Sequence, residues 1–209
     1  MRPKVITLDV ADANLIGFAE NVTGATWTLT TTATTDGLAH QVSIKNDTAT
    51  DHSLKTAILT GTDENGNAQT ETVSLPAGSA TVESTKYFKT LLTVVPSATI
   101  GTDTMDIGWV DEVMSQWVQL DRTIANTVGI QTTVTGTVNY TLQDTTYDIQ
   151  KYLTEEPVWT DCDDTDLVAA TTSQKANYVH VPSAIKLKIN SYSSGAAVAL
   201  SIQHAGGGY

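Results

Sequence analysis

The sequence predicts an all-β protein with two antiparallel β-sandwich domains in tandem. Threonine supplies 37 of the 209 residues, and its β-branched side chain favours extended backbone. Short segments that alternate apolar and polar residues recur along the chain, separated by turns at intervals of about 8–12 residues, as in antiparallel sandwiches. Only residues 112–120 have a helical period, and that segment is short. Helix is therefore expected only in short turns.

The first half of the chain contains the clearest strand pair. Residues 54–60 and 69–75 flank a turn that contains Asn65 and Gly66, and an Asn-Gly pair adopts positive φ at little cost. This pattern predicts a β-hairpin. The other strands expected in this half are residues 5–10, 25–32, 39–46, two segments within 80–95, and 104–110.

The second half has the same alternating style without repeating the sequence. Residues 144–166 are polar and are expected to be irregular. A change of domain near residues 111–115 gives domains 1–112 and 113–209, each of jelly-roll or immunoglobulin-like type. The strands expected in the second half are residues 116–120, 128–134, 138–142, 184–190 and 198–202.

Composition and charge exclude several classes of protein. The formal net charge is -12, so phosphate backbones are repelled and nucleic-acid binding is not expected. No apolar run reaches the roughly 18 residues that a membrane span requires. The N-terminal residues lack an apolar signal sequence, which predicts synthesis in a cytoplasm. Cys162 is the only cysteine, and a disulfide within the chain is therefore impossible.

The sequence has no recognisable catalytic motif, so no catalytic residue and no cofactor are expected. The four histidines are scattered and do not pair at the spacing of metal ligands. Cys162 lies among aspartates, which are expected to raise the pKa of its thiol and make it a poor nucleophile. A hydrolase of unfamiliar geometry stays an alternative, although Glu155 and Glu156 are the only adjacent glutamate pair. The histidines are His40, His52, His180 and His204.

Two acidic segments are candidates for calcium binding. Asp63, Asn65 and Asn67 alternate as in a calcium loop, but Ala68 stands where the EF-hand glycine is needed, so a hairpin turn is the preferred interpretation. A second candidate is a run of four carboxylates within six residues, which repel one another unless a cation or solvent screens them. A solvent-screened loop is the preferred interpretation there too. The run consists of Asp161, Asp163, Asp164 and Asp166.

The four tryptophans raise the alternative of a carbohydrate-binding adhesin module. Trp27 and Trp109 alternate with apolar residues, so core packing is expected for them. Trp159 lies in the polar segment and is a candidate for stacking on a sugar or for an interface. Trp117 completes the set.

Several segments resemble structural proteins of tailed bacteriophages. Residues 60–73 combine a Gly-x-Asp-x-x-Gly turn with a Thr-Glu-Thr strand. A Tyr-Phe-Lys-Thr segment leads into an apolar strand at residues 87–92, and residues 182–187 and 198–203 are similar to terminal hairpins of such proteins. The resemblance implies a small β-sandwich protein present in many copies in a virion. Head decoration (cement) proteins, neck or tail adaptors and short fibres all belong to this class.

Charge and edge strands refine that expectation. An acidic chain is repelled by packaged DNA, so the outside of the head is favoured. Open sheets have unpaired edges, which a neighbouring copy can satisfy under closed symmetry. We therefore expect a homo-oligomer, a trimer first, bound to the major capsid protein or other virion proteins. Residues 1–10 and 205–209 are expected to order against a neighbour.

Overall fold

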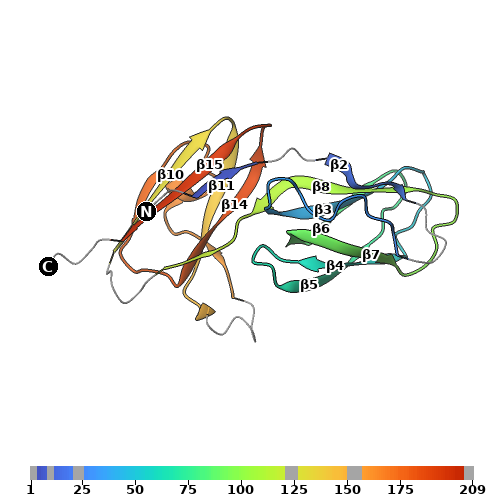
Figure 1. Ribbon diagram of the computed structural model, residues 1–209, viewed down its shortest axis with the longest axis horizontal. Coiled ribbons are helices and arrows are strands. Elements are labelled where there is room, and N and C mark those ends of the chain that lie inside the picture. The colour runs from blue at the N-terminus through green and yellow to red at the C-terminus, as the bar shows by residue number, and fades with distance from the viewer. Residues whose placement is uncertain (1–3, 9–11, 21–25, 121–126, 150–156, 205–209) are drawn as a thin grey trace. The chain divides into compact units, whose positions relative to one another are not determined.

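The computed structural model describes residues 4–8, 12–20, 26–120, 127–149 and 157–204. Among them the protein is all-β: the sheets are antiparallel, and the helical element that lies wholly within the described residues is the 3₁₀ turn η2 (Thr165–Leu167). No described helix has the length and apolar character needed to cross a membrane. The chain divides into two compact units, one of Met1–Leu8 with Ser115–Tyr209 and one of Asp9–Met114 (Figure 1).

The Asp9–Met114 unit contains two sheets. In one, β2 pairs with β8, which is followed by β3 and β6; in the other the order is β5-β4-β7. The strands are β2 (Asp12–Glu20), β3 (Ala39–Asn46), β4 (Thr56–Thr62), β5 (Ala68–Ser74), β6 (Thr81–Phe88), β7 (Thr90–Pro96) and β8 (Met105–Met114).

The β4–β5 hairpin confirms the prediction made from the Asn-Gly turn. Its strands pair in register from Thr56 opposite Ser74 to Thr62 opposite Ala68. Asp63 Oδ1 accepts hydrogen bonds from two backbone N–H groups of the turn, each at 2.8 Å, and Gly66 has φ +91°. The aspartate is therefore engaged in the turn itself, as the hairpin interpretation required.

The core of this unit draws side chains from both sheets. Trp27 and Trp109 are each 2% exposed, which confirms their predicted place in the core. Gly61 lets β4 approach the carbonyl of Thr90 so closely that a Cβ atom would lie 1.9 Å from its oxygen. The core residues are Ile16, Trp27, Val42, Ile44, Ala57, Leu59, Val73, Leu75, Phe88, Leu91, Val94, Ile100, Met105, Ile107 and Trp109.

The unit of Met1–Leu8 and Ser115–Tyr209 also contains two sheets. One has the order β1-β15-β10-β13, and the other has β11 between β12 and β14, with β9 beside β14. The strands are β1 (Lys4–Thr7), β9 (Val118–Gln119), β10 (Val128–Thr135), β11 (Val138–Thr145), β12 (Thr160–Asp161), β13 (Lys175–Tyr178), β14 (Ala184–Tyr192) and β15 (Ala197–His204).

The N-terminal strand corrects two expectations. β1 pairs with β15 through the register Lys4 opposite Leu200, so it belongs with the C-terminal half, unlike the predicted ranges 1–112 and 113–209. Ile6 and Leu8 are each 4% exposed, because they pack inside this unit. The described residues of this segment are therefore ordered within their own chain, whereas the sequence analysis expected residues 1–10 to order against a neighbouring subunit. Residues 9–10 and 205–209 are outside the described part of the chain.

One other predicted strand is wrong. The described part of the predicted strand 25–32 is irregular: it meets β7 only at separate points, such as Trp27 N to Val94 O at 2.9 Å. Residues 112–120, the one segment with a helical period, contain the end of β8 and the short β9, which lies within the predicted strand 116–120. The spacing of its apolar residues is compatible with a helix, but pairing with other strands gives the segment an extended backbone. Strands β2 and β13 were not predicted.

Candidate functional site

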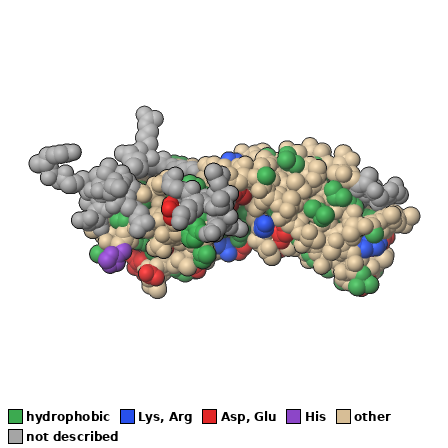
Figure 2. Space-filling model, turned by 90° about the horizontal axis from the view of Figure 1, so that it is seen from below, with side chains coloured by type: hydrophobic (Ala, Val, Ile, Leu, Met, Phe, Trp, Pro, Cys, Tyr) green, Lys and Arg blue, Asp and Glu red, His purple; other side chains and the backbone are tan. Residues whose placement is uncertain are grey.

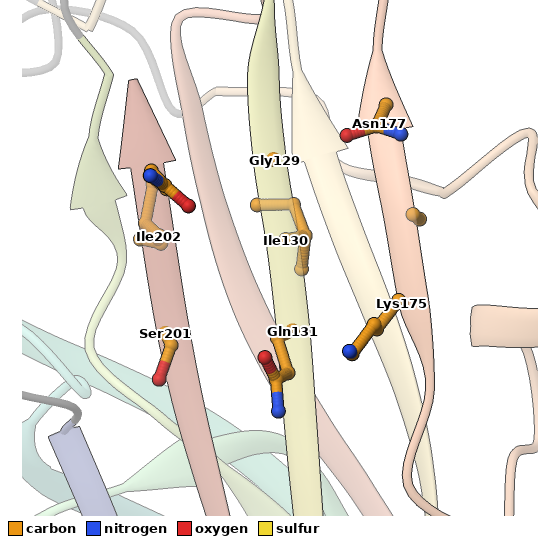
Figure 3. Close-up of a pocket in the computed structure, with 9 residues that line it drawn as sticks. Gly129, Ile130, Gln131, Lys175, Asn177, Ser201 and Ile202 are labelled. Carbon is orange, nitrogen blue, oxygen red and sulfur yellow. The ribbon is translucent and has the colours of Figure 1, made fainter. Parts of the chain in front are cut away.

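A polar hollow of about 650 Å³ lies on the sheet formed by β15, β10 and β13 (Figure 3). Burial alternates along these strands. Ile130, Ala176 and Ile202 point inward and are at most 9% exposed, so the residues on either side of each point to the outer face. We call this hollow, with its outward side chains, the β10 hollow. Those residues are Gly129, Gln131, Lys175, Asn177, Ser201 and Gln203.

Strand register arranges these residues in two rows across the three strands. Gly129 on β10 stands between Asn177 on β13 and Gln203 on β15. Two residues further along, Gln131 lies between Lys175 and Ser201. Figure 3 shows Lys175 extending toward Gln131, and Asn177 beside Gly129. The rows are about 6.7 Å apart and neighbouring strands about 4.8 Å apart, as in any β-sheet.

Gly129 forms the low point of the hollow. It has no side chain, while Asn177 and Gln203 rise on both sides. A Cβ atom added there would lie 3.4 Å from Asn177 Oδ1 and 3.7 Å from the Gln203 carbonyl oxygen, which are ordinary contacts. The glycine is therefore not required by the packing of the strands, and its main effect is to leave space.

The side chains around the hollow have free hydrogen-bonding groups. None of the five polar side chains among its lining residues, those of Gln131, Lys175, Asn177, Ser201 and Gln203, bonds to another residue in the described ranges. Lys175 is the only charged residue among them, and no carboxylate of the described part of the chain lines the hollow. A chain with a net charge of -12 thus presents a locally positive, amide-rich surface.

A smaller pocket of about 220 Å³ borders the same strand, β13, and contains Cys162 and Tyr178. The Tyr178 hydroxyl lies 2.7 Å from Asp144 Oδ2 and 3.2 Å from Cys162 Sγ. Burial raises the pKa of all three groups. A raised pKa of Cys162 was expected from its neighbours; burial is the largest cause, and the charge of Asp144 adds to it, while hydrogen bonds with Tyr178 and with the Asp164 backbone lower the pKa. The thiol is thus held protonated and is a poor nucleophile.

The structure does not bring the four candidate calcium ligands together. Asp161 lies on β12 and its Oδ1 accepts a hydrogen bond from Gln143 at 3.0 Å. Asp164 caps η2 by accepting from the N–H of Asp166 at 3.1 Å. Asp163 is exposed, like the other three. Within the described ranges, no three His, Cys, Asp or Glu side chains are grouped so that they could hold a metal ion.

His40 is buried and held from both sides of its ring. Its Nε2 lies 3.0 Å from Asp36 Oδ2, and its Nδ1 lies 3.1 Å from the Val110 carbonyl oxygen. Asp36 also accepts from the Thr34 hydroxyl and from the N–H of Leu38. These contacts tie the segment before β3 to β8, and they leave no ring nitrogen for a metal or a substrate.

His52 is engaged in the same way. Its Nε2 donates to Asp103 Oδ2 at 2.8 Å, and its Nδ1 accepts from Lys55 Nζ at 3.0 Å. Asp103 stands 51 positions away from His52 in sequence, so a motif of closely spaced residues could not predict this contact. His180 is exposed beside the smaller pocket, and the side chain of His204 is outside the described part.

Trp159 is half-buried, and its ring faces a lysine. Lys186 Nζ lies 4.5 Å from the ring centroid, a cation–π contact that occupies one face of the indole. Trp117 is also half-buried. The tryptophans therefore do not form the exposed aromatic row on which the carbohydrate prediction was based.

A second surface stands out in the other unit, on the outer face of β5-β4-β7. Ile58, Leu92 and Val95 are 46%, 54% and 37% exposed, and Ile58 is directly opposite Val95. Figure 2 shows one side of the molecule, where charged side chains are few among uncharged surface. The outward positions of the three strands carry no charge: they are Thr56, Ile58, Thr60, Thr62, Ala68, Thr70, Thr72, Ser74, Thr90, Leu92, Thr93 and Val95.

Neither a protein-family model nor a curated protein matches the chain.

Proposed function

We propose that the chain is a non-enzymatic structural protein of a tailed-bacteriophage virion, a capsid decoration protein that stabilises the head from outside. The observation that carries this proposal is the uncharged outer face of β5-β4-β7. Monomeric soluble proteins rarely expose a contiguous apolar patch. Here a chain with 23 acidic residues keeps all twelve outward positions of this sheet free of charge and exposes Ile58, Leu92 and Val95 among them. Such a face suits contact with another protein.

We further propose that each unit is a β-sandwich. In the Asp9–Met114 unit, one core cluster includes Ile44 and Ile107 from one sheet and Leu59 and Val94 from the other. Two sheets that share a core in this way form the layers of a sandwich. A rigid β framework of this kind supports a subunit that works by packing, and it agrees with the resemblance to phage structural proteins.

The oligomeric state of the purified protein tests the assembly face. We expect a trimer in light scattering coupled to gel filtration, and a monomer for the double variant Ile58→Asp/Val95→Asp. Val179→Asp is the matched control, because Val179 is 70% exposed but lies in the other unit. A wild-type protein that is strictly monomeric, or a double variant as oligomeric as the control, would overturn the role of this face.

The position of the protein in the virion needs a separate experiment. Mass spectrometry of purified virions should detect the protein in many copies per head, and antibodies should label intact heads. Absence from mature particles would end the virion proposal. Labelling of the neck, tail or a short fibre would keep the class of protein and reject decoration of the head.

A further inference from the structure

We propose that the β10 hollow binds a carbohydrate chain that carries carboxylate groups. This inference goes beyond assembly and rests on a different unit, so it stands or falls separately from the proposed virion role. The volume of about 650 Å³ lies in the range of small-ligand sites. The ligand class follows from the hydrogen-bonding groups, the charge and the backbone around the hollow.

The hydrogen-bonding groups match hydroxyl groups. The amides of Gln131, Asn177 and Gln203 each offer a carbonyl acceptor and an NH₂ donor, and the Ser201 hydroxyl both donates and accepts. A sugar hydroxyl also donates and accepts, so it pairs with either end of an amide. An apolar ligand would cover these groups without pairing them, at a cost of about 1–3 kcal/mol each. The hollow therefore favours a ligand that brings hydrogen-bonding groups to these side chains.

The charge indicates an acidic sugar. Among the described residues around the hollow, Lys175 is the only ionised group, and none of the described residues neutralises it. Lys175, Gln131 and Ser201 form one row across the three strands, and the Lys175 side chain extends toward Gln131 in the middle of that row. A carboxylate at this point gains a charge-assisted hydrogen bond, whereas a polyanion elsewhere on the chain meets a net charge of -12.

The backbone excludes an added peptide strand. β10 is paired with β13 on one side and with β15 on the other, so its N–H and C=O groups are already used. A peptide that binds by extending a sheet needs a free edge, which the floor of this hollow lacks. The ligand must therefore be recognised by the side chains of the two rows, and it must lie in the space above Gly129.

Binding is tested by calorimetry with three acidic oligosaccharides, of galacturonate, mannuronate and N-acetylneuraminate, and with the methyl ester of the galacturonate oligomer. We expect at least one acidic probe to bind. Gly129→Val fills the low point of the hollow and should weaken binding about tenfold or more, the equivalent of about 1.4 kcal/mol. Thr133→Val is the matched control, since it changes the same face of β10 outside the hollow, and it should bind like wild type.

Lys175→Gln tests the charge. It should reduce binding of the acidic probe to the level of the methyl ester, while the ester binds both proteins equally. If Gly129→Val fails to fold by circular dichroism, the double variant Asn177→Ala/Gln203→Ala replaces it. The proposal is overturned if none of the acidic probes binds, or if the hollow variants bind as tightly as Thr133→Val. Equal binding of acid and ester by wild type would overturn the acidic-sugar assignment.

Discussion

Glu71 Oε1 on β5 accepts hydrogen bonds from both the backbone N–H and the hydroxyl of Thr85 on β6, at 2.7 Å and 2.9 Å. Its Oε2 accepts from the N–H of Lys86 at 2.9 Å. β5 and β6 are edge strands of the two sheets in their unit. The Glu71 carboxylate thus accepts hydrogen bonds from two backbone N–H groups of β6 that no neighbouring strand pairs, and it links the edges of the two sheets.

Glu71→Ala is expected to lower the free energy of unfolding by about 1–2 kcal/mol, because charge-assisted hydrogen bonds are lost while water can reach the exposed N–H groups. Urea unfolding followed by tryptophan fluorescence measures the change. Glu83→Ala is the control: Glu83 lies exposed on β6, and its replacement should change stability by less than about 0.5 kcal/mol. Equal effects of the two variants would contradict a structural role for Glu71.

Gly61→Ala is expected to destabilise the protein by about 3 kcal/mol or more. The new Cβ would lie 1.9 Å from the Thr90 carbonyl oxygen, so β4 and β7 must separate to admit it. Gly129→Ala provides the comparison, because its Cβ makes only ordinary contacts. Thermal unfolding of both variants should show a large drop for the first and little change for the second; similar melting temperatures would refute the close approach.

Asp103 makes stability depend on acid pH. The pKa of its carboxyl is lowered from the ordinary 3.8, first by a hydrogen bond from the Thr50 hydroxyl and then by one from His52. The folded state therefore favours the ionised form. The resulting stabilisation is complete above pH 3.8 and is lost as the pH falls through the lowered value. Asp103→Asn should thus melt below wild type at neutral pH, and the gap should narrow in acid. A gap that stays constant over this pH range would contradict the linkage.

Cys162 is expected to react slowly in the folded protein. Burial raises the pKa of its thiol above the ordinary 9.0, and the residue is only 5% exposed, so little accessible thiolate is present. Alkylation by iodoacetamide at mildly alkaline pH should be several-fold slower in native protein than in urea. Alkylation at the same rate in both states would show that the thiol is neither shielded nor held protonated.

Local alternation was sufficient to predict many of the strands. Residues 39–46 became β3 with unchanged bounds, because β-branched and apolar residues alternate there and one face is buried. The hairpin around Gly66 was predictable for the same local reason. In contrast, β2 and β13 have weaker alternation, and they exist as strands because β8 and β10 offer them backbone partners.

Of the β10 hollow, the sequence alone determined only that residues 128–134 alternate, which places Gly129 and Gln131 on one face of a strand. It also determined the all-β class, the acidic charge and the scarcity of charge along β4 and β5. Tertiary structure decided that Lys175, Asn177, Ser201 and Gln203 stand beside that strand. The physical reason is that alternation is a property of neighbouring residues, whereas the register between strands depends on the packing of a core drawn from the whole unit.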